Sequence, residues 1–335
     1  MSVQEKNLIT QRESDAFYCL KCFSILSVIA AHVIPLTSDS GIGIYFLSFW
    51  TLFSKVGVPC FLIVGGFFYI RTDYDSKFFW KKKLERLIIP WLCCSFFTYI
   101  LKGNYNHIDH NLILWDYIKW VLGSGTWYYY IVVYLFCLLI FKLLYKSDFL
   151  LLLAIFVTIA ALTLKSFGIS LTIHSQFMTD YLNPLHWIGF FGLGILIRKY
   201  RFDRLFLSKK RYQLAAGFMS IIWLFFFRQK LYTYFSVYSA INSILWSGLL
   251  LALSYWLTST KIKNYLIRVG KCSYCIYLLH MQFVQWTALL LPNNLVKSIF
   301  CPVIGLAVMM LLIKIGVFIC NKIRFGEKLK KMVGL

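Results

Sequence analysis

The sequence predicts an all-α protein, a polytopic membrane helical bundle of about ten transmembrane helices with both termini cytoplasmic. Hydrophobic residues make up 60% of the 335 residues and charged residues only 14%, and the mean hydropathy is +0.70. A soluble domain covers its core with polar surface, so a lipid bilayer is the solvent that fits this composition. The basic residues also gather in short clusters between long apolar runs, which is typical of membrane proteins.

Ten apolar stretches are each long enough for a helix to cross the bilayer. They fall at residues 17–36, 43–70, 87–102, 126–145, 148–168, 183–199, 212–228, 237–258, 271–291 and 297–320. No small-residue cleavage site follows the first stretch, so we expect a retained helix rather than a signal peptide. The chain shows no internal repeat and no extramembrane segment long enough to fold alone. We therefore expect a single integral membrane domain over residues 1–335.

The Lys and Arg residues between these stretches predict the orientation. One set of alternate loops and tails holds 26 of them and the opposite set holds six. The larger set lies in residues 6–12, 71–86, 142–146, 198–211, 261–271 and 322–331. Because cytoplasmic loops carry the excess of basic residues, we place this set in the cytoplasm and the protein in the plasma (inner) membrane as a multi-pass protein. The net charge of +22 therefore reflects topology, and we expect no nucleic-acid partner.

The longest loop on the outer side spans residues 103–125. It carries His107, Asp109, Trp115 and Trp120 among its polar and aromatic side chains. Such a mixture is typical of an amphipathic segment that dips back to the membrane surface. We expect this loop to form a lid or an acceptor-binding surface.

Ionisable residues inside the spans are functional candidates because their placement there costs free energy. All 13 acidic residues lie in loops or near helix ends, which disfavours a proton-relay transporter, whereas His32, Lys55 and His280 lie within spans. Lys21 precedes His32 by eleven residues, so both lie within about 20° of one helix face and about 16 Å apart along the axis. A phosphorylated donor with a long flexible arm suits this arrangement, because the cation can bind its phosphate while its thioester reaches the imidazole. In the alternative interpretation Lys21 anchors the helix at the interface and His32 forms a hydrogen bond in the bundle.

A second cationic pair lies before the third span. Lys83 and Arg86 are three residues apart, so they share a helix face at the predicted cytoplasmic surface, where they suit phosphate groups. The same residues also serve as ordinary orientation signals. Two Cys-x-x-Cys pairs begin at Cys19 and Cys272. Both pairs fall inside predicted helices without the turn that zinc sites use, so we expect no metal site.

Six short motifs occur in the order seen in the acyltransferase-3 family of integral membrane O-acyltransferases. The motifs are Lys21-x10-His32, residues 58–68 (VPCFLIVGGFF), Lys83-x-x-Arg86, residues 125–128 (GTWY), residues 190–194 (FFGLG) and residues 273–280 (SYCIYLLH). The chain resembles this family over nearly its whole length.

The resemblance implies a membrane acyltransferase, most simply an O-acetyltransferase. The implied donor substrate is cytoplasmic acetyl-CoA or another acyl-CoA, and no cofactor is permanently bound. The implied acceptor is a hydroxyl group of a cell-surface polysaccharide or of a lipid-linked glycan. The expected partners are therefore the acyl-CoA, the envelope glycan and the lipid bilayer.

The resemblance also assigns roles to individual residues. His32 matches the essential histidine of the family and is the expected catalytic residue. Lys21 and Lys83 stand where the family has arginines, and together with Arg86 they are expected to bind the donor. A lysine keeps the charge of an arginine but lacks its planar fork, so donor affinity is the property that these departures affect.

Two further positions depart from the family pattern. Tyr18 stands where the family often has an acid, for which Asp15 is the nearest substitute, and Gly65 stands where the family commonly has serine. His32 either acts as a general base on the acceptor hydroxyl or carries the acyl group itself. Both routes need a neutral imidazole, which a low-dielectric bundle favours.

Trp127, Tyr277 and His280 are the expected substrate-binding residues. For the two aromatic residues, core packing or the interfacial belt is the other interpretation. The competing hypothesis for the whole protein is a non-enzymatic transporter or flippase of envelope precursors. The combination of phosphate-binding cations with an imidazole on one path favours the enzyme, because a transporter needs no such combination.

Overall fold

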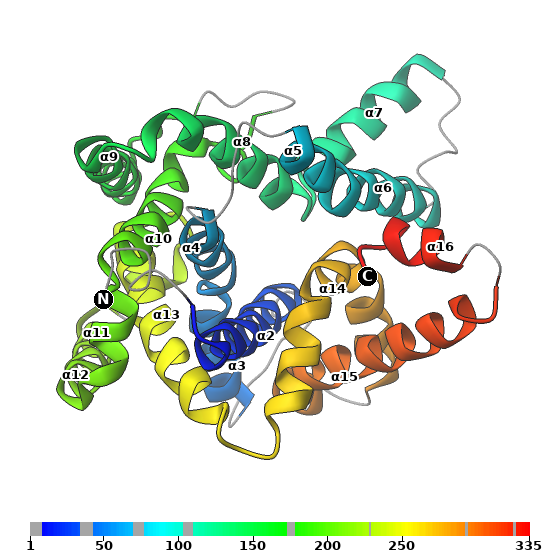
Figure 1. Ribbon diagram of the computed structural model, residues 1–335. Helices are drawn as coiled ribbons and strands as arrows, with labels where there is room; N and C mark the ends of the chain where they lie inside the picture. The colour runs from blue at the N-terminus through cyan, green and yellow to red at the C-terminus, as the bar shows by residue number, and fades with distance from the viewer. Residues whose placement is uncertain are drawn as a thin grey trace.

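The computed structural model describes residues 9–33, 43–69, 77–102, 110–172, 178–227, 229–291, 294–323 and 326–335 (Figure 1). These residues form helices joined by turns, and no strand occurs among them, which confirms the predicted all-α class. The α-helices are α2 (Gln11–Val33), α3 (Gly43–Ser54), α4 (Gly57–Tyr69), α5 (Lys77–Lys83), α6 (Ile89–Leu101), α7 (His110–Leu122), α8 (Tyr129–Leu144), α9 (Asp148–Ser166), α10 (Ile188–Tyr200), α11 (Phe202–Ser208), α12 (Lys210–Phe227), α13 (Val237–Leu257), α14 (Lys263–Leu290), α15 (Asn294–Cys320) and α16 (Gly326–Met332). The described residues also form three short helices, namely η2 (Leu84–Ile88), η4 (Pro184–His186) and η5 (Gln229–Tyr232).

Helical structure covers each predicted span over most of its length. Six helical segments of the described chain are long and apolar enough to cross a membrane, namely Gln11–Val33, Phe49–Tyr69, Phe79–Leu101, Asp148–Ser166, Val237–Leu257 and Phe300–Cys320. Helix α8 is apolar but shorter. The protein is therefore a multi-pass helical membrane protein, while the count of about ten spans and the cytoplasmic side of the termini stay predictions.

The stretch predicted as one span at 43–70 consists of two helices. A turn at residues 55–56 separates α3 from α4. Serines from other helices donate hydrogen bonds to two carbonyl groups at this turn. The Ser27 hydroxyl donates to the Phe53 carbonyl at 2.6 Å, and the Ser243 hydroxyl donates to the Lys55 carbonyl at 2.9 Å. These bonds make a turn possible inside an apolar bundle, where water cannot bind the backbone.

The helix that carries the second cationic pair is also irregular. The segment Leu84–Ile88 is a π-helix between α5 and α6, and the Ile89 amide donates to the Leu84 carbonyl five residues earlier. Pro90 has no amide hydrogen and cannot bond to the carbonyl four residues before it, which is that of Arg86. The proline therefore disrupts the regular α-helical hydrogen bonding at Arg86, the residue that is expected from the sequence to bind the donor.

Part of the predicted outer loop folds as helix α7. Residues 103–109, which include His107 and Asp109, lie outside the described residues. Helix α7 packs against α6, burying Trp120 and Val121 and leaving Trp115 exposed. The location of this loop on the outer side and its role as a lid stay predictions.

Glycines allow the central helices to approach closely. A methyl group built on Gly270 of α14 would lie 1.9 Å from the Tyr18 carbonyl oxygen of α2, and one on Gly194 of α10 would lie 2.0 Å from the Ile63 carbonyl oxygen of α4. Only glycine permits these backbone contacts. Figure 1 shows α2 and α14 packed together near the centre of the bundle. This contact decides which side chains of the two helices meet.

An ion-pair cluster holds the first turns of α2. The buried Glu13 carboxylate binds Arg201 at 2.9 Å and Arg204 at 2.6 Å, and the Asp15 carboxylate binds Lys263 of α14 at 2.7 Å. Acidic side chains at a helix N-terminus also interact favourably with the helix dipole. Asp15 is thus bound to α14, which fixes the start of α2.

The predicted orientation has a direct test. Reporter fusions within residues 77–86 and 198–211 are expected to behave as cytoplasmic, and fusions near residue 115 as external, because only this arrangement places the basic clusters on one side. Paired alkaline phosphatase and fluorescent protein fusions measure the two sides independently. A cytoplasmic signal from a fusion at residue 115 would show that the ten-span topology is wrong.

Candidate active site

A cavity of about 500 Å³ lies between α2, α4, α8, α14 and the helix that contains the π segment. Its volume is in the range of small-molecule binding sites. The described lining residues are Lys21, Phe61, Val64, Gly65, Phe68, Tyr69, Phe79, Lys82, Lys83, Arg86, Leu87, Tyr130, Tyr134, Leu138, Ser273, Tyr274, Tyr277 and Gly334. Four of them are cationic and none is acidic.

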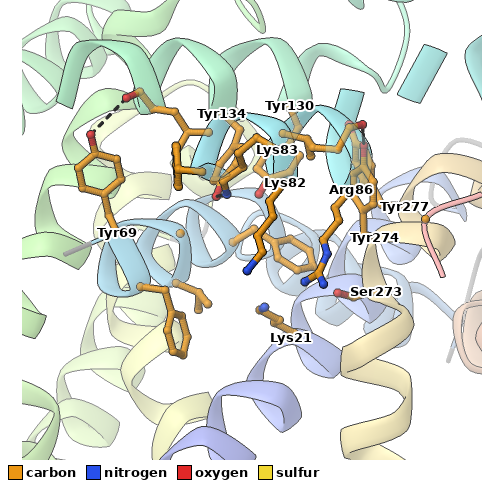
Figure 2. A pocket seen from close by; sticks show the side chains of 18 residues that line it. Lys21, Tyr69, Lys82, Lys83, Arg86, Tyr130, Tyr134, Ser273, Tyr274 and Tyr277 are labelled. Carbon is orange, nitrogen blue, oxygen red and sulfur yellow. Dashed lines mark hydrogen bonds between the residues drawn. The ribbon is translucent and has the colours of Figure 1, made fainter. Parts of the chain in front are cut away.

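The cations come from two separate parts of the chain. Lys21 belongs to α2, whereas Lys82, Lys83 and Arg86 belong to α5 and the π segment. Figure 2 shows the polar ends of Lys21, Lys82 and Arg86 directed toward a shared space, with the Ser273 hydroxyl beside them. Several positive charges around a partly enclosed space attract anions, and phosphate groups bind well to such a set.

Hydrogen bonds hold the cationic segment in place. The Lys83 ammonium donates to the Tyr134 hydroxyl at 3.2 Å and lies 5.3 Å from the centre of that ring. The Tyr274 hydroxyl of α14 donates to the Leu87 carbonyl at 2.5 Å. Because this bond uses a carbonyl in the π segment, it joins α14 to the helix that carries Arg86.

Aromatic rings form one wall of the cavity. The Tyr130 and Tyr277 rings meet edge to face with centres 5.3 Å apart. Gly65 lies against Tyr134, where an added methyl group would be 2.8 Å from a ring carbon. The glycine thus leaves room for the Tyr134 ring, which accounts physically for the departure from the serine that the family commonly has here.

Two histidines from different helices lie beyond this wall. The ring centres of His32 on α2 and His280 on α14 are 4.9 Å apart. His280 is fully buried, and its Nδ1 lies 2.6 Å from the Tyr277 carbonyl oxygen. Since a carbonyl only accepts, Nδ1 carries the hydrogen and Nε2 has a free lone pair. No other group in the described part of the chain bonds to that Nε2.

Trp127 and Tyr277 connect the histidines with the cavity. The Tyr277 hydroxyl donates to the Trp127 carbonyl, and the Trp127 indole donates to the Leu278 carbonyl at 3.4 Å. The His280 ring centre is 5.7 Å from that of Tyr277 and 6.1 Å from that of Trp127. Tyr277 also lines the cavity. One residue therefore touches both the cationic cavity and the histidine pair.

The structure groups the residues predicted from sequence into two adjoining sets. Lys21, Lys83, Arg86 and Tyr277 share the cavity, whereas His32, His280 and Trp127 lie next to it and do not line it. Their catalytic and binding roles stay predictions.

Sequence reasoning missed several lining residues, namely Lys82, Tyr130, Tyr134, Ser273 and Tyr274. Tyr277 follows Ser273 by four residues and Tyr274 by three, so the spacing could have placed each of them next to Tyr277 on α14. Lys82 lies in a run of basic residues, and because each lysine there also serves as an orientation signal, the sequence does not single it out.

The remaining candidates lie apart from the cavity. The Lys55 ammonium lies 4.8 Å from the centre of the Tyr234 ring. Cys19, Cys22 and Cys272 are free thiols. Within the described ranges, no group of three or more potential metal ligands occurs.

Comparison with known proteins assigns the family. The model of the acyltransferase domain matches residues 15–320, a range that contains every predicted site residue. No curated protein and no solved structure matches the chain. Because the match spans nearly the whole chain, the protein belongs to the acyltransferase-3 family of membrane acyltransferases.

Proposed function

We propose that the protein transfers an acyl group, most simply acetyl, from cytoplasmic acyl-CoA to a hydroxyl of a cell-surface polysaccharide or lipid-linked glycan. The observation that supports this proposal is the cavity with four cations, which adjoins the His32–His280 pair through Tyr277. In a family of acyltransferases, this arrangement provides separate places for an anionic donor and for the reacting groups.

The cations of the cavity would bind the donor phosphates. Arg86 can grip a phosphate with two parallel hydrogen bonds, and Lys21, Lys82 and Lys83 supply point charges around it. The aromatic wall offers apolar surface to the rest of the donor. Acyl-CoA is a substrate in this scheme, so the protein needs no resident cofactor.

The donor arm would reach from the cations to the histidines. Lys21 and His32 lie about 16 Å apart along α2, at 1.5 Å per residue. Tyr277 lies between the two regions and touches both. An extended arm that passes Tyr277 would therefore bring the thioester to His32 while the phosphates stay at the cations.

His32 supports two balanced routes for the transfer. In the direct route its imidazole takes the proton of the acceptor hydroxyl, the oxygen forms an ester bond with the acyl carbon, and the carbon–sulfur bond breaks. The CoA thiolate then takes the proton from the imidazolium. In the relay route the imidazole attacks the acyl carbon, and the carbon–sulfur bond breaks to release the CoA thiolate. The acceptor hydroxyl then attacks the acyl-imidazole, the carbon–nitrogen bond breaks, and the hydroxyl proton goes to the thiolate. In both routes the thioester becomes an oxygen ester and free CoA is released.

The function is tested by comparing the ester content of surface glycans with and without the protein. Cells that express the wild-type chain are expected to incorporate radiolabelled acetyl from acetyl-CoA into base-labile esters of envelope glycan. Cells that express His32→Ala at equal membrane levels serve as the matched control. A transporter would instead change the amount of glycan at the surface, and unchanged ester content with altered surface glycan would contradict the proposal.

A further inference from the structure

A second cavity, of about 440 Å³, lies between α6, α14, α15 and α16. Its described lining is almost wholly apolar and includes Phe97, Leu279, Phe283, Met309 and Leu312, with Lys330 as its one charged residue. Figure 1 shows α16 packed beside α6 and near the end of α15.

The final residues of the chain separate this cavity from the donor cavity. Met332, Val333 and Leu335 line the apolar cavity, whereas Gly334 lines the cationic one. The Cys94 thiol donates to the Met332 carbonyl at 3.9 Å and ties this segment to α6. The two cavities are therefore distinct sites that share one wall.

Gly316 keeps the apolar cavity open. It lines the cavity in the last part of α15, and a methyl group built on it would meet nothing within 4 Å. Side chains around an unfilled space lose their dispersion contacts, and water gains no hydrogen bonds from an apolar lining. The chemistry of the lining thus suits a hydrocarbon chain.

Basic residues gather on α16 and at the end of α15. Lys330 lines the cavity, and Lys328 and Lys331 belong to the same short helix and are exposed. Lys322, at the end of α15, is exposed as well. Glu327, the one acidic residue of α16, binds Lys330 at 2.5 Å. The excess of positive charge beside the end of an apolar helix favours an anionic lipid headgroup.

We propose that this cavity binds an anionic phospholipid of the bilayer. One hydrocarbon chain occupies the space between α6, α14 and α15, and the phosphate lies against the lysines of α16. The site is independent of the donor, because acyl-CoA phosphates bind on the other side of the C-terminal segment. Lipid binding at this cavity is therefore tested independently of the proposed enzymatic activity.

Photo-crosslinking of the purified full-length protein tests the site. The probe is phosphatidylglycerol with a diazirine in one acyl chain, and peptide mass spectrometry locates the label. We expect labelling on the facing parts of α14 and α15. Gly316→Leu should lower it about tenfold, the cost in affinity of displacing roughly two methylene groups. Gly217→Leu is the matched control, since Gly217 has one neighbour, the Leu249 side chain at 4.0 Å, and lies on α12.

Two further arms distinguish the possible occupants. The double variant Lys328→Glu with Lys331→Glu, which leaves the apolar lining intact, should remove the preference for phosphatidylglycerol over phosphatidylcholine carrying the same diazirine. Unchanged labelling in Gly316→Leu, or equal labelling by the two lipids in the wild type, would overturn the proposal. Displacement of the probe by excess acyl-CoA would overturn it too, because the cavity would then hold the acyl chain of the donor.

Discussion

His32→Ala is expected to lose acyl transfer by about a hundred- to ten-thousandfold per folded molecule, the usual contribution of general acid–base catalysis. The step needs a group that takes a proton from a hydroxyl or carries the acyl group. His32 lies next to the cationic cavity, and the described lining of that cavity has no carboxylate that could replace it. The measurement is CoA release and glycan ester formation, normalised to the folded fraction from size-exclusion chromatography and thermal melting.

His280→Ala is the control variant for the loss of acyl transfer in His32→Ala. His280 is the other imidazole in the pair, and its bond to the Tyr277 carbonyl holds its ring in place. A normal specific activity in His32→Ala together with a loss in His280→Ala would move the catalytic role to α14. Full activity in both variants would remove the histidine pair from the mechanism.

The second large effect is expected at the cations. Lys21→Glu or Arg86→Glu should weaken acyl-CoA binding by roughly ten- to hundredfold, because loss of a hydrogen bond to a charged group costs about 1.5–3 kcal/mol. Equilibrium binding to the purified protein at a fixed ionic strength measures this effect, since salt screens exposed charges.

Lys81→Glu is the matched control for charge reversal. Lys81 belongs to the same basic run of α5 and is exposed, but it does not line the cavity. It should therefore leave the affinity for acyl-CoA nearly unchanged. Equal losses in Lys81→Glu and Arg86→Glu would show that the general positive charge of this surface, rather than the cavity, binds the donor.

The helices and part of the site follow from sequence because their physics is local. Apolar length predicts a span, and the 100° turn per residue places Lys21 and His32 on one face. Lys83 and Arg86 both line the cavity as predicted from their spacing, although the π segment Leu84–Ile88 replaces the regular α-helix that the prediction assumed. In the structure the side chains predicted from separate segments meet, because Lys21 and Arg86 line the same cavity from different helices.

The features that sequence reasoning missed depend on contacts between distant segments. The turn between α3 and α4 is stable because serines from α2 and α13 bind its carbonyls. The pairing of His32 with His280 depends on the close approach of Gly270 to Tyr18. The periodicity of a single segment gives no information about such contacts between segments.

The most direct test of the two-part site measures donor binding and CoA release on the same preparations of three proteins, the wild type, His32→Ala and Arg86→Glu. The cavity and the histidine pair are adjoining but separate, so His32→Ala should bind acyl-CoA with wild-type affinity and release CoA about a hundred- to ten-thousandfold more slowly. Arg86→Glu should bind acyl-CoA weakly and recover CoA release when acyl-CoA is raised to saturation. If His32→Ala loses donor binding together with CoA release, or if it releases CoA at the wild-type rate, then the division between a donor cavity and a catalytic histidine is wrong.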